Sequence, residues 1–209
     1  MNYPVVVMDF CAGGDLHTKL STEPTIMCNT KIVHLVHDVL KALLHLHSNA
    51  VIHRDVELAN IPFDHGQKAL LGDMGIAILV SRTRTAARPG TPGWVAPEYW
   101  PDRGQAYGTK IDVFSASLVM ACVGQGSTVP TTLEPDESVH WLDDTPPWLK
   151  ELHEHTHQRN PIQRWSSQRA CQMMSAVVPV QERDMVHDLA PPLRSEGSES
   201  SGVSGAGQN

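Results

Sequence analysis

At residues 53–60 the chain reads His53-Arg54-Asp55-Val56-Glu57-Leu58-Ala59-Asn60, and this stretch decides the fold more than any other. It directly follows a segment, 30–48, in which apolar residues recur at intervals of three and four. That spacing places one broad apolar stripe along a helix, and such a stripe must pack against other parts of the chain. We therefore predict a polar loop held at the end of an amphipathic helix.

The remaining pattern predicts a mainly helical fold with short strands. The β-branched run from Val5 to Val7 indicates a buried strand. Two short apolar stretches, Ile61 to Phe63 and Ala69 to Leu71, flank a turn and indicate two small strands. Helical segments are expected in the second half at 111–123, where the helix is apolar nearly all round, and at 148–153 and 167–178.

The composition is that of an ordinary globular protein, with 41% hydrophobic and 19% charged residues among 209. A formal net charge of -7 gives no electrostatic reason to expect nucleic acid as a partner. The four cysteines are widely spread, which favours reduced thiols over a disulfide framework. No apolar run approaches the ~18 residues of a membrane span. We expect a cytoplasmic or nuclear protein with no membrane segment.

Two further motifs follow the loop in order. Asp73-Met74-Gly75 lies thirteen residues past Asn60, and Gly90-Thr91-Pro92-Gly93-Trp94-Val95-Ala96-Pro97-Glu98 lies further on. Together with residues 53–60 they resemble the catalytic loop, the metal-binding motif and the end of the activation segment of protein kinases, of the serine/threonine type. The stretch from Gly72 to Ala77 is loosely similar to NIMA-related kinases.

The resemblance covers about residues 3 to 178 and implies an α+β, mainly helical fold, namely the hinge and carboxy-terminal lobe of a kinase with short β-hairpins. A kinase-like domain is thus expected at 1–178. Residues 179–209 are expected to form a disordered tail, because most of this segment has little apolar content. No glycine-rich loop or strand lysine of an amino-terminal lobe can be located before the hinge, so we expect the chain alone to bind ATP poorly.

The resemblance also implies roles for the motif residues in ATP- and Mg²⁺-dependent phosphoryl transfer to a protein substrate. Asp55 would accept or orient the substrate hydroxyl proton, while Asn60 and Asp73 would hold Mg²⁺ through oxygen ligands. The residues expected at the ATP site are the gatekeeper Met8, the hinge residues Asp9, Phe10 and Cys11, Asp15 near the ribose, and Pro62 beneath the adenine.

Other matched positions are expected to support or regulate the loop. Glu98 would pair with Arg164 and clamp the end of the activation segment. A helix that begins near Asp112 would support the catalytic loop, and Arg54 would pair with a phosphate on the activation segment. The remaining structural or regulatory positions are His53, Thr91 and the candidate phosphorylation sites Ser81, Thr83 and Thr85.

Glu57 departs from the family pattern. Serine/threonine kinases carry lysine two residues after the catalytic aspartate, where it neutralises the transferred phosphate, and residue 59 is alanine, so no substitute cation is visible. Reversing this charge would slow phosphoryl transfer. Two functions therefore stay open: a serine/threonine kinase, and a catalytically impaired pseudokinase or truncated fragment that acts as an interaction module for a scaffold partner.

A different class of enzyme is suggested by His153-Glu154-His155-Thr156-His157, which satisfies the zinc-binding pattern H-E-x-x-H. The chain holds 12 histidines, so short patterns of this kind arise by chance, and no third ligand is indicated. We expect a solvated, histidine-rich helix surface here and no metal. His34, His37, His45 and His47 are likewise expected on a helix surface or at a helix end.

Overall fold

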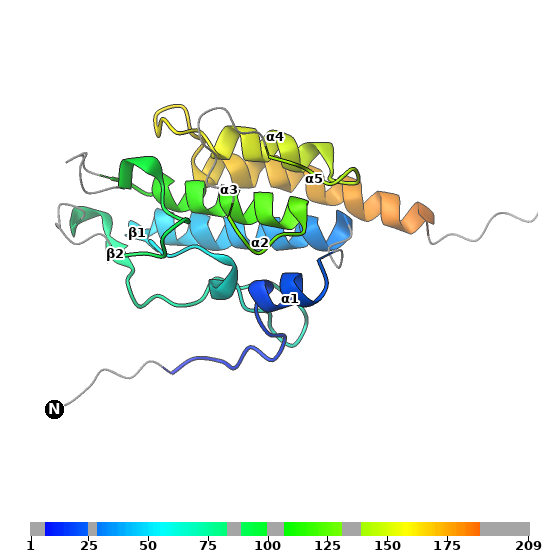
Figure 1. The fold of residues 1–209 in the computed structure, drawn as a ribbon, viewed down its shortest axis with the longest axis horizontal. Helices are drawn as coiled ribbons and strands as arrows, with labels where there is room; N and C mark the ends of the chain where they lie inside the picture. The colour runs from blue at the N-terminus through cyan, green and yellow to red at the C-terminus, as the bar shows by residue number, and fades with distance from the viewer. Residues whose placement is uncertain (1–6, 25–28, 83–88, 100–106, 131–138, 189–209) are drawn as a thin grey trace, which may run out of the picture.

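Helices make up most of the structure, a computed structural model that describes residues 7–24, 29–82, 89–99, 107–130 and 139–188 (Figure 1). The two long helices predicted from the apolar periodicity, at 30–48 and 111–123, are confirmed. The helices are α1 (Leu16–Thr22), α2 (Asn29–Ser48), α3 (Lys110–Gln125), α4 (Pro147–Thr156) and α5 (Ser167–Asp188).

The helix α3 lies between α2 and α4 in Figure 1, and α5 packs against α2 and α4. Every residue from Ile111 to Gly124 is buried, which explains why this segment is apolar around its whole circumference. The helix ends at Gly126, which adopts the left-handed conformation (φ 63°) that lets its N–H bond back to the last turn. The amphipathic α2 packs its apolar stripe against α5 and α3.

The described strands are two short ones, β1 (Val51–Ile52) and β2 (Ile78–Leu79), which pair antiparallel. The two strands predicted at 61–63 and 69–71 form an irregular antiparallel pairing around the turn and no regular strand. Phe63 and Ala69 form an isolated bridge, and the Asp64 N–H donates to the Lys68 carbonyl (3.0 Å). Pro62 has no N–H to donate, so it cannot extend a ladder, although its carbonyl still accepts a bond from the Leu70 N–H (2.9 Å).

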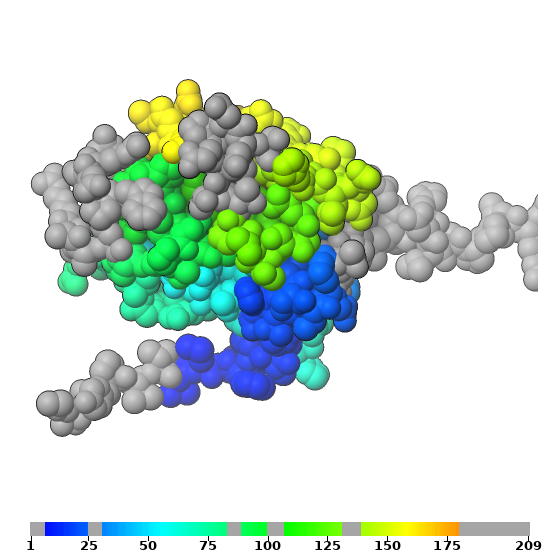
Figure 2. Space-filling model, in the orientation of Figure 1, coloured from blue at the N-terminus to red at the C-terminus, as the bar shows by residue number. Residues whose placement is uncertain are grey.

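Of the strand predicted at Val5 to Val7, Val5 and Val6 lie outside the described residues, and Val7 is exposed. Residues 7–10 have no regular structure, and the side chains of Val7, Met8 and Phe10 are 92%, 71% and 89% exposed. In the space-filling view this segment extends from the body beside α1 (Figure 2). The N–H of Gly13 donates to the Phe63 carbonyl (2.9 Å), so backbone bonds between this segment and the rest of the fold begin at Gly13.

At the other end, α5 continues past the expected domain end at 178 and reaches Asp188. Residues 189–209, the rest of the predicted tail, lie outside the described residues. Within the described part of the chain, no helix is both long and apolar enough to cross a membrane.

Candidate active site

The strand pair β1–β2 brings the two central motifs together. β1 runs directly into His53, and β2 follows Asp73-Met74-Gly75 after two residues, with Ile52 opposite Ile78. The buried imidazole of His53 adds a second link, because its Nε2 lies 2.8 Å from the Gly72 carbonyl oxygen. The loop at 53–60 and the motif at 73–75 therefore form one site.

Asp112, in the first turn of α3, fixes the start of this loop. Its buried carboxylate accepts hydrogen bonds from the backbone N–H groups of His53 (2.9 Å) and Arg54 (2.9 Å). Arg54 adopts a left-handed conformation (φ 71°), which is costly for a side chain with a Cβ and is maintained here by these bonds. Helix α3 thus holds the loop at its first two residues.

The carboxylate of Asp55 is oriented from two directions. Its Oδ1 accepts hydrogen bonds from the N–H (3.0 Å) and the hydroxyl (2.8 Å) of Thr91. Its Oδ2 accepts one from the amide Nδ2 of Asn60 (3.0 Å), which also donates to the Asp55 backbone carbonyl (2.9 Å). Because a carboxylate oxygen can accept two bonds, Oδ2 retains capacity for one further donor.

Oxygen atoms suited to a hard cation lie beside Asp55. The Gly72 N–H donates to the Asn60 carbonyl (2.9 Å), which places Asn60 next to Asp73 across the loop. Asp73 is exposed and left-handed (φ 53°), and its Oδ1 accepts a bond from the Gly75 N–H (3.0 Å). A Cβ on Gly75 would meet Asp73 Oδ1 at 2.9 Å, so this tight turn favours glycine. The remaining oxygens of Asn60 and Asp73 fit the oxygen-rich coordination that Mg²⁺ requires.

Glu57 adds negative charge to the same loop. It precedes the short 3₁₀ helix η1 (Leu58–Asn60) and is half-buried. Burial and then the neighbouring Asp55 carboxylate raise the pKa of Glu57, while Thr91 acts in the opposite direction. Among the described residues, neither Glu57 nor Asp55 forms an ion pair with a cation.

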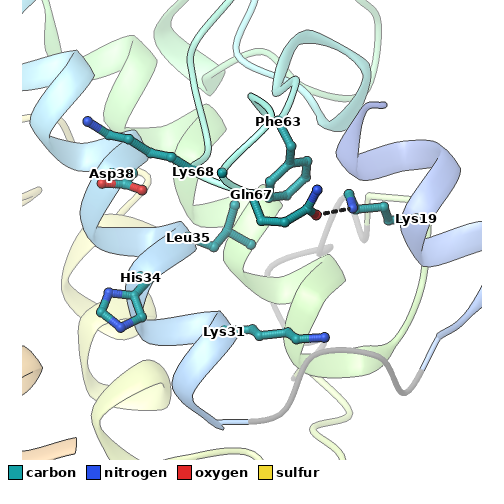
Figure 3. Close-up of a pocket in the computed structure, with 9 residues that line it drawn as sticks. Lys19, Lys31, His34, Leu35, Asp38, Phe63, Gln67 and Lys68 are labelled. Atoms are coloured by element: carbon teal, nitrogen blue, oxygen red, sulfur yellow. Dashed lines mark hydrogen bonds between the residues drawn. The ribbon is translucent and has the colours of Figure 1, made fainter. Parts of the chain in front are cut away.

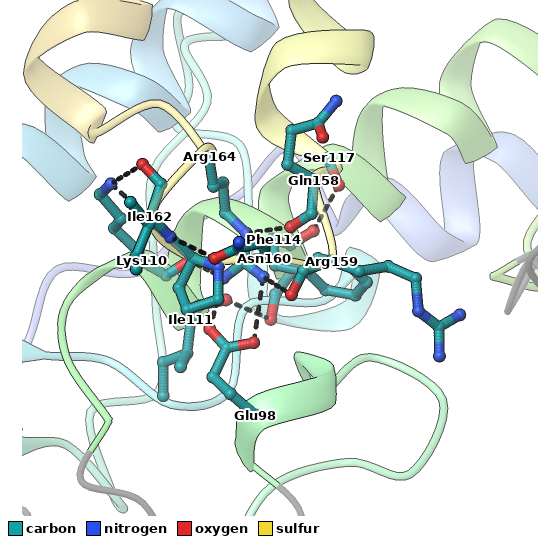
Figure 4. Close-up of polar contacts among 12 residues, drawn as sticks. Glu98, Lys110, Ile111, Phe114, Ser117, Gln158, Arg159, Asn160, Ile162 and Arg164 are labelled. Carbon is teal, nitrogen blue, oxygen red and sulfur yellow. Dashed lines mark hydrogen bonds and ion pairs between the residues drawn. The ribbon is translucent and has the colours of Figure 1, made fainter.

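A buried ion pair joins Glu98, at the end of the segment 90–98, to Arg164 (Figure 4). Arg164 contacts Glu98 through two parallel bonds, Nη1 to Oε1 (2.6 Å) and Nη2 to Oε2 (3.0 Å). The guanidinium also donates to the backbone carbonyls of Gln158 (2.7 Å) and Lys110 (2.9 Å). Arg164 is 1% exposed and lies over the Phe114 ring, so its charge is fully paired within the core.

Comparison with known proteins agrees with this arrangement: residues 2–175 match the protein kinase domain. The chain belongs to the protein kinase family. The family predicted from the sequence motifs is therefore confirmed, as is a mostly helical fold with a small antiparallel sheet.

Several curated protein kinases resemble this one over part of their length. RasGEF domain-containing serine/threonine-protein kinase X of Dictyostelium discoideum is 38% identical over 119 residues, which is 56% of this chain and 12% of that protein. Serine/threonine-protein kinase 1 of Arabidopsis thaliana is 30% identical over 141 residues, 66% of this chain and 16% of that protein. Nik-related protein kinase of Homo sapiens is 31% identical over 140 residues, which is 64% of this chain and 9% of that protein. The chain thus spans only a small part of these relatives.

The kinase resemblance also assigned residues to an ATP site, and the structure brings only some of these together. Asp15 and Pro62 form an antiparallel bridge. The Asp15 carboxylate caps α1, accepting bonds from the Thr18 N–H (2.8 Å) and hydroxyl (2.9 Å). The other residues assigned to this site lie on the open segment before α1, with Cys11 half-buried and Met8, Asp9 and Phe10 exposed.

Arg54 is engaged within the site. Its Nε donates to the Ile76 carbonyl (2.6 Å), and its Nη1 lies 3.3 Å from the Tyr107 hydroxyl. Ser81 is exposed in the short 3₁₀ helix η2 (Val80–Arg82). The other candidate phosphorylation sites, Thr83 and Thr85, lie outside the described residues. Pairing of Arg54 with a phosphate stays a prediction.

The expectation of a solvated histidine surface at 153–157 was wrong. His153 is buried, its ring stacks on that of His157 (centroids 4.8 Å apart), and His157 stacks on Phe114 (4.6 Å). Burial lowers the pKa of His153 to about 3 and that of His157 to about 4. The described residues contain no group of three His, Cys, Asp or Glu side chains placed to hold a metal ion. The His153 imidazole therefore packs in the core, and the half-buried imidazole of His157 lies between it and Phe114.

His47 lies at the end of α2, as the sequence predicted, but its side chain has partners that the sequence did not indicate. Its Nε2 lies 2.9 Å from Asp112 Oδ2 and its Nδ1 lies 2.8 Å from the Ser167 hydroxyl. This imidazole therefore links α2, α3 and α5 behind the catalytic loop. One signal was present in the sequence: His47 follows the apolar stripe of α2 at a spacing of four from Leu43.

Proposed function

We propose that this chain forms the carboxy-terminal lobe of a serine/threonine protein kinase, which transfers phosphate from ATP to a protein hydroxyl. The observation that carries this proposal is the double support of Asp55 by Thr91 and Asn60. A base must be held within hydrogen-bond reach of the proton that it accepts. Asp55 has one acceptor position left on Oδ2, the position that a substrate hydroxyl would occupy.

The other residues would act through position and charge. Asn60 and Asp73 would hold Mg²⁺, which would neutralise the charge of the transferred phosphate. Thr91 would link the base to the activation segment, which runs on to Glu98 and its pair with Arg164. The relatives carry serine/threonine kinase names, which supports protein serine or threonine as the acceptor.

The proposal is tested by transfer of radiolabelled phosphate from ATP and Mg²⁺ to a generic protein substrate. We expect slow transfer by the wild-type chain that is abolished by Asp55→Asn, because the amide cannot accept the proton. A matched control is Asp64→Asn, which changes the same functional group on a turn away from the loop. Transfer unchanged in Asp55→Asn would refute the proposal. If wild type shows no transfer even at high enzyme concentration, the impaired pseudokinase acting as an interaction module is supported instead.

A further inference from the structure

A cavity of ≈ 430 Å³ lies outside the catalytic loop, between α1, the first half of α2 and the turn at 63–68. Figure 3 shows Lys19 beside Gln67, Lys31 extending from α2, and Lys68 on the turn with its side chain pointing away from the Phe63 ring; Phe63 and Leu35 also line the cavity. Lys19 is fixed there by a bond from its Nζ to the Gln67 side chain (2.8 Å) and by its place over the Phe63 ring (4.6 Å). The cavity therefore has cationic walls and an apolar floor.

A second cavity of ≈ 420 Å³ continues from the first one along α2. Asp38 and Lys68 line both cavities, and Lys41, Ala42 and Leu70 lie further along. The α2 residues that line them recur at three and four, so they form one stripe on the helix opposite the turn at 63–71. We call this continuous feature the lysine groove, lined by Lys19, Lys31, Lys41 and Lys68.

The charge of the lysine groove is opposite to that of the chain. The net charge of the protein is -7, and its sequence contains six lysines, at 19, 31, 41, 68, 110 and 150. Four of these six line the groove, against one carboxylate, Asp38. The ammonium groups of Lys31, Lys41 and Lys68 make no hydrogen bond or ion pair with the described residues. They remain available to an external anion.

We propose that the lysine groove binds an acidic segment of a partner protein, with the carboxylates of that segment on the lysines. Lys31 and Lys41 lie ten residues apart on α2, which is about 15 Å of helix. An extended peptide covers that length with about four or five residues. The lysines face a concave groove, which suits a single peptide better than a flat anionic membrane. Phe63 is 5% exposed and offers no face on which nucleic-acid bases could stack.

The test is binding of a short fluorescent peptide of alternating glutamate and leucine, followed by fluorescence anisotropy. We expect Lys31→Glu/Lys68→Glu to weaken binding by about tenfold or more, because two attractions become repulsions. Asp38→Asn should strengthen binding by about twofold to fivefold, because it removes the one negative charge of the groove. A gain of affinity cannot come from loss of folding, so this variant keeps the test independent of stability.

Controls separate groove binding from general electrostatics. Lys150→Glu, on α4, makes the same charge change away from the groove and should leave affinity within twofold of wild type, and a peptide of alternating lysine and leucine should not bind. Equal losses in Lys150→Glu and in Lys31→Glu/Lys68→Glu would overturn the proposal. So would tighter, groove-dependent binding to phosphatidylserine vesicles or to an oligonucleotide than to the peptide, since the occupant would then be a membrane or a nucleic acid.

Discussion

The clamp between Glu98 and Arg164 and the loop around Asp55 both concentrate charge, but they differ in how that charge is balanced. Arg164 is buried, and its guanidinium is paired with a carboxylate and with several backbone carbonyls. Asp55 and Asp73 have no cation paired to them among the described residues, and Glu57 lies beside them as another acid.

The difference separates a structural charge from a functional one. Burying an unpaired charge costs several kcal/mol, so the clamp must be complete before the helices can pack around it. An open loop can leave carboxylates unpaired because water solvates them, and it then offers them to a cation such as Mg²⁺. The clamp should therefore control folding, and the loop should control activity.

The largest effect is expected at the clamp. Arg164→Ala should lower the free energy of unfolding by about 3–5 kcal/mol, because Glu98 is left buried without a partner. Denaturation by urea, followed by circular dichroism, measures this change. Arg82→Ala is the matched control on an exposed site and should change stability by less than about 0.5 kcal/mol. Equal, small effects at both arginines would contradict the division between the two regions.

Substitution of Glu57 should change the activity of the loop and leave stability nearly unchanged, the reverse of what is expected at the clamp. Glu57→Lys should raise the rate of phosphate transfer by about tenfold to a hundredfold, because repulsion beside Asp55 becomes attraction toward the transferred phosphate. The measurement is transfer of radiolabelled phosphate, compared with Glu57→Gln, which should give a smaller gain. A rate that falls in both variants would show that Glu57 contributes to the reaction.

The paired imidazoles of α4 predict how the helical core responds to acid. The pKa values of His153 and His157 are lowered to about 3 and about 4 from 6.5, so the unfolded chain binds protons more readily than the folded one. Stability is therefore greatest above pH 6.5 and falls as the pH drops toward 4. We expect each histidine to account for a loss of order 1–2 kcal/mol between about pH 6.5 and pH 5.

Urea denaturation at a series of pH values measures this loss. His157→Phe should flatten the dependence below pH 6.5, because Phe fills the stack without binding a proton. His34→Gln, which removes an exposed histidine of α2, should leave the curve unchanged. An identical pH dependence in wild type and His157→Phe would exclude the stacked pair as its source.

Sequence reasoning succeeded where one local signal determined the outcome. The periodicity of 30–48 and the uniform apolarity of 111–123 were sufficient to predict α2 and α3. Reasoning failed where packing between distant elements decided the environment. His153 and His157 have the polarity of surface residues, and it is the contact of His153 with Trp141 and of His157 with Phe114 that removes them from solvent.

Residues 61–71 pair around a turn as predicted, but they form no regular strands, for a local reason that the sequence did contain. The apolar stretches there suggested two strands, yet Pro62 removes one of the few donors that so short a ladder would have. For the site, the motifs predicted which residues would cluster, and the structure adds the bonds that orient them, such as Thr91 to Asp55. The bond from His47 to Asp112 depends on how α2 and α3 cross, which the spacing of either helix alone does not specify.

The smallest expected effect distinguishes a structural from a ligand-binding role for Asp15. Both oxygens of its carboxylate cap α1 through Thr18, and these bonds, acting against burial, lower the pKa of Asp15. Asp15→Ala should therefore lower the free energy of unfolding by about 1 kcal/mol, whereas Asp15→Ser, which can still cap the helix, should change it by a few tenths. Urea denaturation of the three proteins measures the difference.

If Asp15 also contacts a ribose, the serine variant should keep its stability and lose affinity for a fluorescent ATP analogue. Equal stability in the alanine and serine variants would show that the cap contributes nothing, and would leave nucleotide binding as the role of this carboxylate.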